Sequence, residues 1–193
     1  YRILLRQDDA DMRLTPRGFE IGLASRERYD LMLGKKRQRD ALIDFARNFS
    51  VKAARINPFL EGKGLSPLRQ SVKLYDLILR PQLDIFMLAE AIGPLAEHIA
   101  GIEEQRREEI VESAEILIKY QGYIDRERLI AEKILRLEHV KLRGKIVYAD
   151  VKAISTEARQ KLTKIDPETV AQASRIPGIS PSDINILLLL LGR

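Results

Sequence analysis

The chain has 193 residues, of which 45% are hydrophobic and 32% are charged, and its formal net charge is +5. It contains no cysteine, which excludes disulfides and thiolate metal sites, and its two separated histidines, His98 and His139, argue against a histidine zinc site. The longest apolar run, Ile186 to Leu191, is far shorter than the ~20 residues of a membrane-spanning helix, so we expect no membrane span. The lack of cysteine fits a reducing compartment, and we expect a cytoplasmic protein.

The start of the chain indicates that it was excised from a longer protein. It begins with Tyr1 rather than methionine, and Tyr1 to Arg6 has the composition of an ordered element, with a weak strand signal over 1–5. Further along, a helix-capping residue is followed by proline at four places, and each pair predicts a helix start. These pairs are Thr15-Pro16, Ser66-Pro67, Asp166-Pro167 and Ser180-Pro181.

Helix signals dominate the first hundred residues. We expect helices over 25–49, 68–79 and 84–92, with a loop over 57–64 where Pro58 and two glycines occur. The helix over 68–79 should stop before Pro81, because a residue before proline is pushed out of the helical region, and the helix over 84–92 should end at Gly93-Pro94. A basic cluster at Lys35, Lys36, Arg37 and Arg39 is interpreted as a solvated face.

Residues 102–138 are predicted to form one long helix that carries Lys119-Tyr120-Gln121-Gly122-Tyr123. Two heptad stripes, one with Ile116 and Tyr123 and one with Leu117 and Ile124, should pack one face against neighbours. The tyrosines are then either core or rim aromatics, or side chains that stack on nucleic-acid bases while Lys119, Arg126 and Arg128 bind phosphates. The spacing leaves both alternatives open.

Residues 146–193 are expected to form a small module of three short helices, over 156–165, 168–174 and 182–191. A bundle packed through Ile184, Leu187, Leu188 and Leu191 explains most of its apolar side chains, but not Arg175 or a helix that is apolar on every side. The segment 173–187 also resembles a helix-hairpin-helix, although Ser180 replaces a glycine of such hairpins. The only other strand signal covers 145–148.

No pattern of catalytic chemistry is found. The chain has no G-x-G-x-x-G after a strand and no P-loop, and acidic pairs such as Asp8-Asp9 and Glu103-Glu104 are typical of solvated faces. We therefore predict no catalytic, cofactor-binding or metal-ligating residue in this chain. The fold class is predicted to be all-α with little or no strand: a junction over 1–15, an elongated helical domain over 16–145 and a helical module over 146–193.

Three segments together resemble a known family. Residues 1–15, the sequence Lys-Tyr-Gln-Gly-Tyr-Ile at 119–124 and Gln-Ala-Ser-Arg-Ile-Pro-Gly-Ile-Ser-Pro at 172–181 are similar, in order and spacing, to the C-terminal region of the tRNA uridine 5-carboxymethylaminomethyl modification enzymes, also called glucose-inhibited division protein A (GidA or MnmG). The departures are Asp9, where the family usually has asparagine, Gln121, where it usually has glutamate, and Pro177 and Ile179. The Gln121 departure puts in doubt a salt bridge with Lys119.

The resemblance implies an enzyme larger than this chain. Family members bind FAD and use NADH in an upstream dinucleotide-binding domain. With a GTPase partner (MnmE) and methylenetetrahydrofolate, they add an aminomethyl or carboxymethylaminomethyl group to carbon 5 of the wobble uridine of certain tRNAs. The resemblance implies that the full-length protein is a homodimer. It also implies that the helical C-terminal region docks the GTPase and helps to hold tRNA, without binding a cofactor or catalysing the reaction itself.

These implications select two sets of candidate residues. The tRNA-binding candidates are Arg2, Arg6, Arg13, Lys119, Tyr120, Tyr123 and Arg126. The partner-binding candidates are Ser174, Arg175, Ile176, Gly178, Ile186, Leu187 and Leu190. The alternative function is a structural or self-association domain without nucleic-acid contact.

Overall fold

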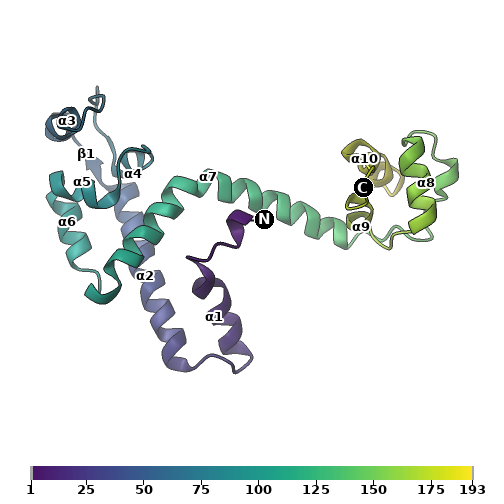
Figure 1. The fold of residues 1–193 in the computed structure, drawn as a ribbon, viewed down its shortest axis with the longest axis horizontal. Coiled ribbons are helices and arrows are strands. Elements are labelled where there is room, and N and C mark those ends of the chain that lie inside the picture. The colour runs from purple at the N-terminus through teal and green to yellow at the C-terminus, as the bar shows by residue number, and fades with distance from the viewer. Residues whose placement is uncertain (1, 193) are drawn as a thin grey trace. The chain divides into compact units, whose positions relative to one another are not determined.

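The structure is a computed structural model that describes residues 2–192, and it confirms the all-α prediction (Figure 1). The chain divides into two compact units between Ile124 and Asp125. This division lies earlier than the boundary between 145 and 146 that we expected from the sequence. It falls within one long helix, α7 (Arg107–Glu138), so each unit contains part of that helix.

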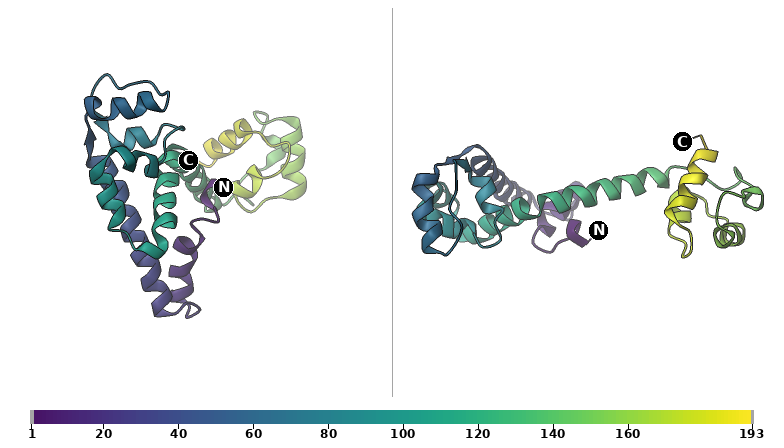
Figure 2. Two further views of the ribbon diagram at one scale, coloured as in Figure 1. Left: turned by 60° about the vertical axis from the view of Figure 1, so that its left-hand side comes forward. Right: turned by 90° about the horizontal axis from the view of Figure 1, so that it is seen from above.

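The first unit consists of helices with one minor sheet (Figure 2). Its helices are the 3-10 helix η1 (Arg2–Leu4), α1 (Ala10–Glu20), α2 (Arg26–Asn48), α3 (Ala53–Gly62), α4 (Leu74–Ile78), α5 (Ile85–Ala91), α6 (Gly93–Ala100), the 3-10 helix η2 (Glu104–Arg106) and the start of α7. Strands β1 (Ser50–Val51) and β2 (Val72–Lys73) pair antiparallel, with Ser50 opposite Lys73. The core is built from α2 through α7 and includes Leu42, Leu77 and Ile118.

Local caps explain the helix starts that the sequence predicted correctly. The Ser25 hydroxyl accepts a hydrogen bond from the N–H of Arg28 at the start of α2, and the Asp84 carboxylate accepts one from the N–H of Met87 in α5. Each bond satisfies a backbone donor that the first helical turn leaves unpaired. The helices predicted over 25–49 and 84–92 are therefore confirmed.

Two of the predicted starts in the first unit are wrong. Pro16 lies inside α1, which begins at Ala10, and no helix begins at Ser66-Pro67. Proline within a helix costs roughly 3 kcal/mol. Tertiary contacts between α1 and α2 offset this cost, among them the ion pair between Asp11 and Lys35.

Other elements that the sequence predicted in the first unit also differ from the observed structure. The predicted loop over 57–64 is wrong, because Asn57 and Pro58 lie in α3, where buried Ile56 and Leu60 hold one helix face in the core. The helix predicted over 68–79 is shorter and consists of α4. Gly93-Pro94 ends α5 as predicted and also starts α6, since proline suits the first helical turn. The strand signal over 1–5 is wrong, because 2–4 form η1.

The second unit has its own small core. Beyond the end of α7 it contains the 3-10 helix η3 (Tyr148–Asp150), α8 (Thr156–Ile165), α9 (Val170–Ser174) and α10 (Pro181–Leu190). The three predicted helices are confirmed, and Leu142, Leu162, Val170 and Leu187 are fully buried among them. The strand signal over 145–148 is wrong, because no strand forms there and Tyr148 begins η3.

The third capping pair, Asp166-Pro167, ends a helix instead of starting one. Asp166 adopts a left-handed conformation with a φ of 46° and terminates α8, whereas α9 is capped by the hydroxyl of Thr169. Ser180-Pro181 does start α10 as predicted. Among the described residues, no helix is both long enough and apolar enough to span a membrane.

Candidate interaction surfaces

The two stripes of α7 have different environments. Ile110 and Ile124 of one stripe are buried and Leu117 is partly buried against the core, as predicted. On the other stripe Leu137 packs against the core of the second unit, whereas Tyr123 and Ile130 are exposed, so the expectation that this stripe packs against neighbours is wrong at Tyr123 and Ile130. Large apolar side chains that are exposed on a helix mark a surface available for contact.

Tyr120 and Tyr123 form an exposed aromatic pair in the first unit. Their side chains are 47% and 63% exposed, and their ring centroids lie 6.3 Å apart with planes tilted by 50°. Neither tyrosine is a core residue. Gly122 lies between them, and a Cβ atom added at Gly122 would meet nothing within 4 Å. The backbone beside the tyrosines is therefore open to close approach by another molecule.

Lys119 is held inside the first unit. Its ammonium Nζ donates to the backbone carbonyl of Leu83 and to Glu115 Oε1, both at 2.7 Å. Glu115 in turn accepts from the N–H of Ile85, the first residue of α5, at 2.9 Å. Lys119 thus fastens α7 to the start of α5, and its salt bridge is made with Glu115, four residues earlier on the helix. Its charge is already compensated and is a poor choice for neutralising a phosphate.

Two of the three junction arginines are also engaged. Arg6 Nε pairs with Asp8 at 2.9 Å, and Arg13 Nε pairs with Asp9 at 3.0 Å while its Nη2 donates to the carbonyl of Arg6. These contacts fix the turn that leads into α1. Arg2 is exposed, and no group among residues 2–192 pairs with its side chain. Arg126, on the α7 portion of the second unit, is exposed and unpaired within the same range.

The basic cluster of α2 contains an ion pair that the sequence analysis missed. Lys35 is only 8% exposed and forms salt bridges with Asp11 of α1, at 2.6 Å, and with Glu109 of α7. Burial by itself lowers the pKa of Lys35, but the hydrogen bonds from its ammonium to Asp11 and Glu109 outweigh that effect and raise it. The interpretation as a solvated face therefore holds for Lys36 and Arg37 but is wrong for Lys35 and Arg39, which are buried.

The Pro177-Gly178 turn has a structural role in the second unit. Gly178 has a φ of 92°, and a Cβ atom there would lie 2.1 Å from Glu157 Oε1. The carbonyl of Pro177 accepts a hydrogen bond from Lys161, so the turn packs directly on α8. The positive φ favours glycine, whereas the close atoms are the ends of the flexible Glu157 and Lys161 side chains, which can move. Gly178 thus has a conformational role in the turn, and because it is exposed its candidacy as a partner contact stays a prediction.

Asp183 joins the starts of two helices. Its carboxylate accepts from the backbone N–H groups of Ser155 and Ser180, at 2.8 and 2.9 Å, and from the Ser180 hydroxyl at 2.7 Å. Burial alone would raise the pKa of Asp183, but these hydrogen bonds hold it below its ordinary value. A carboxylate therefore takes the Ser180 amide that a phosphate would need in a helix-hairpin-helix, and this favours the structural interpretation of the turn.

The apolar helix α10 has a buried side and an exposed side. Leu187 is fully buried, so it belongs to the core and its assignment as a surface contact is wrong. Leu189 and Leu190 are 74% and 55% exposed, and Ile186 is partly buried against the core. The remaining candidates are partly used internally. Arg175 pairs with Glu138 at 2.6 Å, the Ser174 hydroxyl donates to the carbonyl of Ala171, and Ile176 packs against the core.

The described residues do not fit a flavin or a nicotinamide nucleotide. Both strands have two residues, and β1 leads into α3 without a glycine-rich loop, so the strand–loop–helix unit that binds a dinucleotide pyrophosphate is missing from residues 2–192. The same range contains no group of three or more His, Asp or Glu side chains placed to hold a metal ion.

Comparisons with known proteins all indicate the same family. Two family descriptions match: "tRNA modifying enzyme MnmG/GidA C-terminal helical domain" over residues 26–128 and "tRNA modifying enzyme MnmG/GidA C-terminal helical bundle" over 130–193. The tRNA uridine 5-carboxymethylaminomethyl modification enzymes MnmG of Parabacteroides distasonis and Bacteroides thetaiotaomicron are each 58% identical over the whole chain. The chain spans 31% of the length of each.

Solved structures give the same result. GidA of Aquifex aeolicus, in its form II crystal, matches 97% of this chain and 28% of its own with a TM-score of 0.61 and 32% identity. These matches identify the chain as a helical region of the kind that accompanies a tRNA-modifying enzyme. More specifically, the chain belongs to the MnmG/GidA family and corresponds to its C-terminal helical domains.

Proposed function

We propose that this chain is the partner- and tRNA-docking region of an FAD-dependent tRNA modification enzyme. With a GTPase partner, MnmE, the full-length enzyme would add an aminomethyl or carboxymethylaminomethyl group to carbon 5 of the wobble uridine, in the cytoplasm and as a homodimer. FAD and NADH would bind to a part of the protein outside this chain. Family membership supports the reaction class, and the absence of a dinucleotide unit among residues 2–192 is compatible with this division of labour.

The observation that carries the docking proposal is that each unit exposes large apolar side chains on a helix whose other face is buried. In the first unit these are Tyr120 and Tyr123 of α7, and in the second they are Leu189 and Leu190 of α10. Aromatic rings stack on unpaired bases with little sequence preference, whereas exposed leucines suit a protein partner. We therefore assign tRNA contact to the tyrosine pair and GTPase docking to the exposed side of α10.

The candidate sets are narrowed accordingly. In the proposed tRNA contact, Arg2 and Arg126 keep a direct role, whereas Arg6, Arg13 and Lys119 stabilise the fold that presents it. In the proposed partner contact, Ile186 and Leu190 stay, Leu189 is added, and Arg175 is a rim residue tied to Glu138. Residues 1–15 are proposed to form the junction that follows the cofactor-binding domain.

The tRNA contact is tested with a Tyr120→Ala, Tyr123→Ala double variant of the full-length protein. Stacking is worth about 1–3 kcal/mol per base, so the double variant should weaken tRNA binding by about tenfold or more in a fluorescence anisotropy titration. Leu129→Ala is the matched control, because Leu129 is an exposed apolar residue of the same helix. Equal affinities of the double variant and the control would contradict the tRNA assignment.

The partner contact is tested with a Leu189→Glu, Leu190→Glu double variant in a pull-down with the purified GTPase. A charged pair in an apolar interface should abolish capture, whereas Asn185→Glu, at an exposed position of the same helix, should not. Normal capture by the double variant would show that the GTPase binds to another surface. The alternative of a self-association domain predicts instead that the same variant lowers the molar mass measured by sedimentation.

A further inference from the structure

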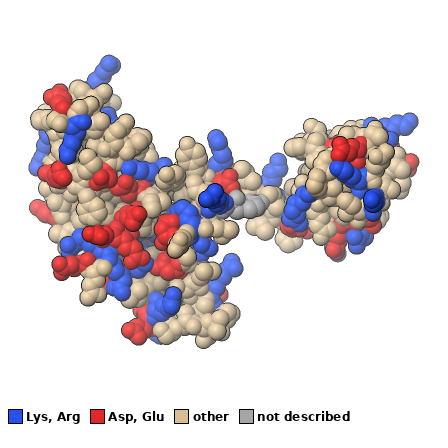
Figure 3. All heavy atoms as spheres, viewed as in Figure 1, with Lys and Arg blue, Asp and Glu red and all other residues tan. Residues whose placement is uncertain are grey.

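The positive charge of the chain is concentrated in the second unit. Residues 125–193 contain thirteen Lys and Arg against nine Asp and Glu, whereas residues 1–124 contain twenty against nineteen. Figure 3 accordingly shows acidic and basic side chains closely intermixed over the visible face of the first unit. Long-range attraction of a polyanion therefore comes mainly from the second unit, in which no tRNA contact apart from Arg126 has been assigned above.

Helix α8 has a shallow hollow of about 400 Å³ on its outer face. Arg159, Gln160, Thr163 and Lys164 line it from one side of α8, and Ala149 of η3 closes it. Its floor is mostly carbon, and its rim carries two cations and an amide. This combination suits a ligand that has both an apolar ring and negative charge.

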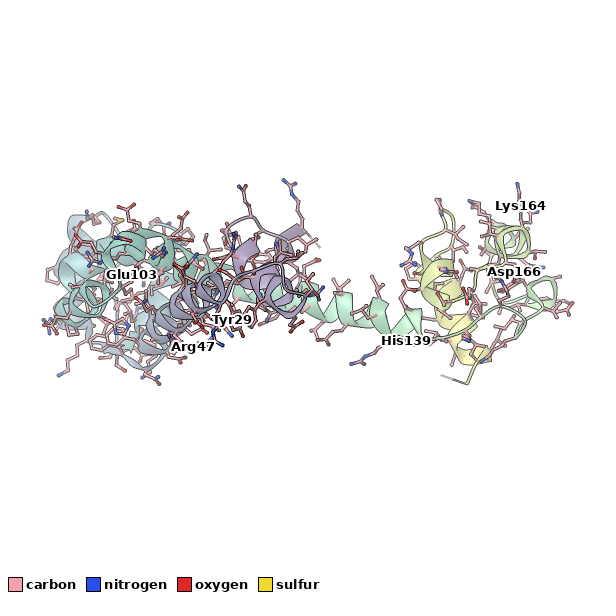
Figure 4. All side chains as sticks on the ribbon, turned by 90° about the horizontal axis from the view of Figure 1, so that it is seen from below. Tyr29, Arg47, Glu103, His139, Lys164 and Asp166 are labelled. Atoms are coloured by element: carbon pink, nitrogen blue, oxygen red, sulfur yellow. The ribbon has the colours of Figure 1, made fainter. Side chains whose placement is uncertain are left out.

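The two cations of the hollow have no partner within the described chain. Arg159 Nε is buried and donates to no acceptor, and no carboxylate among residues 2–192 pairs with Arg159 or Lys164. Lys161 of the same helix differs, because it pairs with Glu157 at 2.6 Å. The Arg159 and Lys164 side chains therefore carry positive charge that no carboxylate of residues 2–192 neutralises. Figure 4 shows Lys164 projecting outward from α8.

Asp166, the acidic residue nearest in sequence to Lys164, already has a cationic partner. Asp166 follows the last residue of α8, where its carboxylate and the helix dipole would both repel an anion. Arg143 compensates for this, since its Nε lies 3.2 Å from the Asp166 carboxylate and its Nη2 donates to the Asp166 carbonyl at 2.6 Å. The charges of Arg159 and Lys164 are therefore left available.

We propose that the α8 hollow binds the sugar–phosphate backbone of tRNA, with Arg159 and Lys164 each contacting a phosphate and the carbon floor receiving the ribose between them. Arg159 and Lys164 are five positions apart, which is about 7.5 Å along the helix axis, so two long side chains can reach neighbouring phosphates of one strand. The contact is independent of base sequence. It rests on the proposed function and adds a second tRNA contact in the unit that also carries α10.

The test uses the full-length protein with Arg159→Gln, Lys164→Gln and the double variant. Affinity for tRNA is measured by fluorescence anisotropy over a series of salt concentrations. Each single variant should lower the slope of log K against log salt by about 0.7 to 0.9, and the double variant by about twice that, with roughly tenfold weaker binding. The matched control is Lys133→Gln, an exposed and unpaired lysine on the α7 portion of the second unit, which should change the slope by much less.

Two further measurements separate binding from folding. Arg159→Lys keeps the charge but removes the planar donor group, so it should preserve the salt slope while lowering affinity. Lys164 is exposed, so Lys164→Gln should leave the melting temperature unchanged and its loss of binding cannot reflect misfolding.

Two outcomes overturn the proposal. The first is a double variant that behaves like Lys133→Gln while wild-type protein binds tRNA, which overturns the hollow and leaves the proposed function standing. The second is absence of tRNA binding by the wild-type protein at every salt concentration, which overturns the hollow and the tRNA part of the proposed function together.

Discussion

The two units of this chain reach stability in different ways. The first has an extensive aliphatic core and a buried cation, Lys35, that joins three helices. The second has a smaller core and depends on one carboxylate, Asp183, to hold the starts of α8 and α10 together. Because a small core leaves less apolar surface to bury, short-range polar contacts take a larger share of the second unit's stability. In the second unit, a turn that packs on a helix, such as Pro177-Gly178, is therefore hard to distinguish by sequence from a turn that docks a partner.

The largest effect should come from removing one core leucine in each unit. Leu77→Ala in the first unit and Leu162→Ala in the second each delete a fully buried side chain, at a cost of about 2–5 kcal/mol. We expect Leu77→Ala to lower only the transition of the first unit and Leu162→Ala only that of the second, measured by calorimetry. A single transition shifted equally by both variants would show that the units unfold together.

The next largest effect concerns the buried cation. Lys35→Met leaves Asp11 and Glu109 without their partner, and removing one member of a buried ion pair costs about 3–5 kcal/mol. Glu109 is largely exposed, so we expect a smaller loss of about 2 kcal/mol, confined to the first unit. Lys36→Met, at the exposed neighbouring position, should change the melting temperature little, and equal effects of the two variants would remove Lys35 from its structural role.

These contacts show where prediction from sequence succeeds. Ser25, Asp84 and Ser180 cap helices with residues three positions away, so the whole signal is local and the starts of α2, α5 and α10 were predicted correctly. Thr15, Ser66 and Asp166 carry the same local pattern without starting a helix. Their outcome is set by packing between segments far apart in the chain, which a capping pattern does not report.

The candidate surfaces show the same limit. The heptad pattern of α7 identified two apolar stripes, but it does not distinguish buried Ile124 from exposed Tyr123, because both suit a helix face. Lys35 was grouped with solvated cations, since its partner Glu109 is distant in sequence. Lys119 was grouped with phosphate-binding cations although Glu115 lies four residues earlier, and its second partner, the carbonyl of Leu83, is distant in sequence. The hollow on α8 gave no sequence signal, because an unpaired arginine is recognised only after every neighbour is placed.

A smaller effect is expected at the joint of the second unit. Asp183→Asn keeps the size of the side chain but weakens its charged hydrogen bonds to Ser155 and Ser180, at a cost of about 1–2 kcal/mol. Since the pKa of Asp183 is lowered by folding, its stabilisation is complete above the ordinary value near 3.8 and is lost as pH falls through the lower folded value. Melting of the second unit of the wild type should therefore decline in acid more steeply than that of Asp183→Asn, and parallel pH profiles would contradict this role.

The smallest expected effect concerns His98. Acid should destabilise the first unit through His98 at a higher pH than it destabilises the second unit through Asp183. The ring of His98 stacks on Phe45 with centroids 4.8 Å apart, and burial lowers the pKa of His98 below its ordinary value near 6.5. The folded state therefore binds the proton less readily than the unfolded state, so the contribution of His98 to stability is complete above pH ~6.5 and falls as pH drops from there toward the folded pKa. Between pH 7 and 5 the first unit should therefore lose stability, while the Asp183 joint of the second unit is unaffected in that range. His98→Phe keeps the aromatic stacking without a titratable group and should flatten the profile of the first unit alone, whereas an unchanged slope in this variant would assign the loss to other groups.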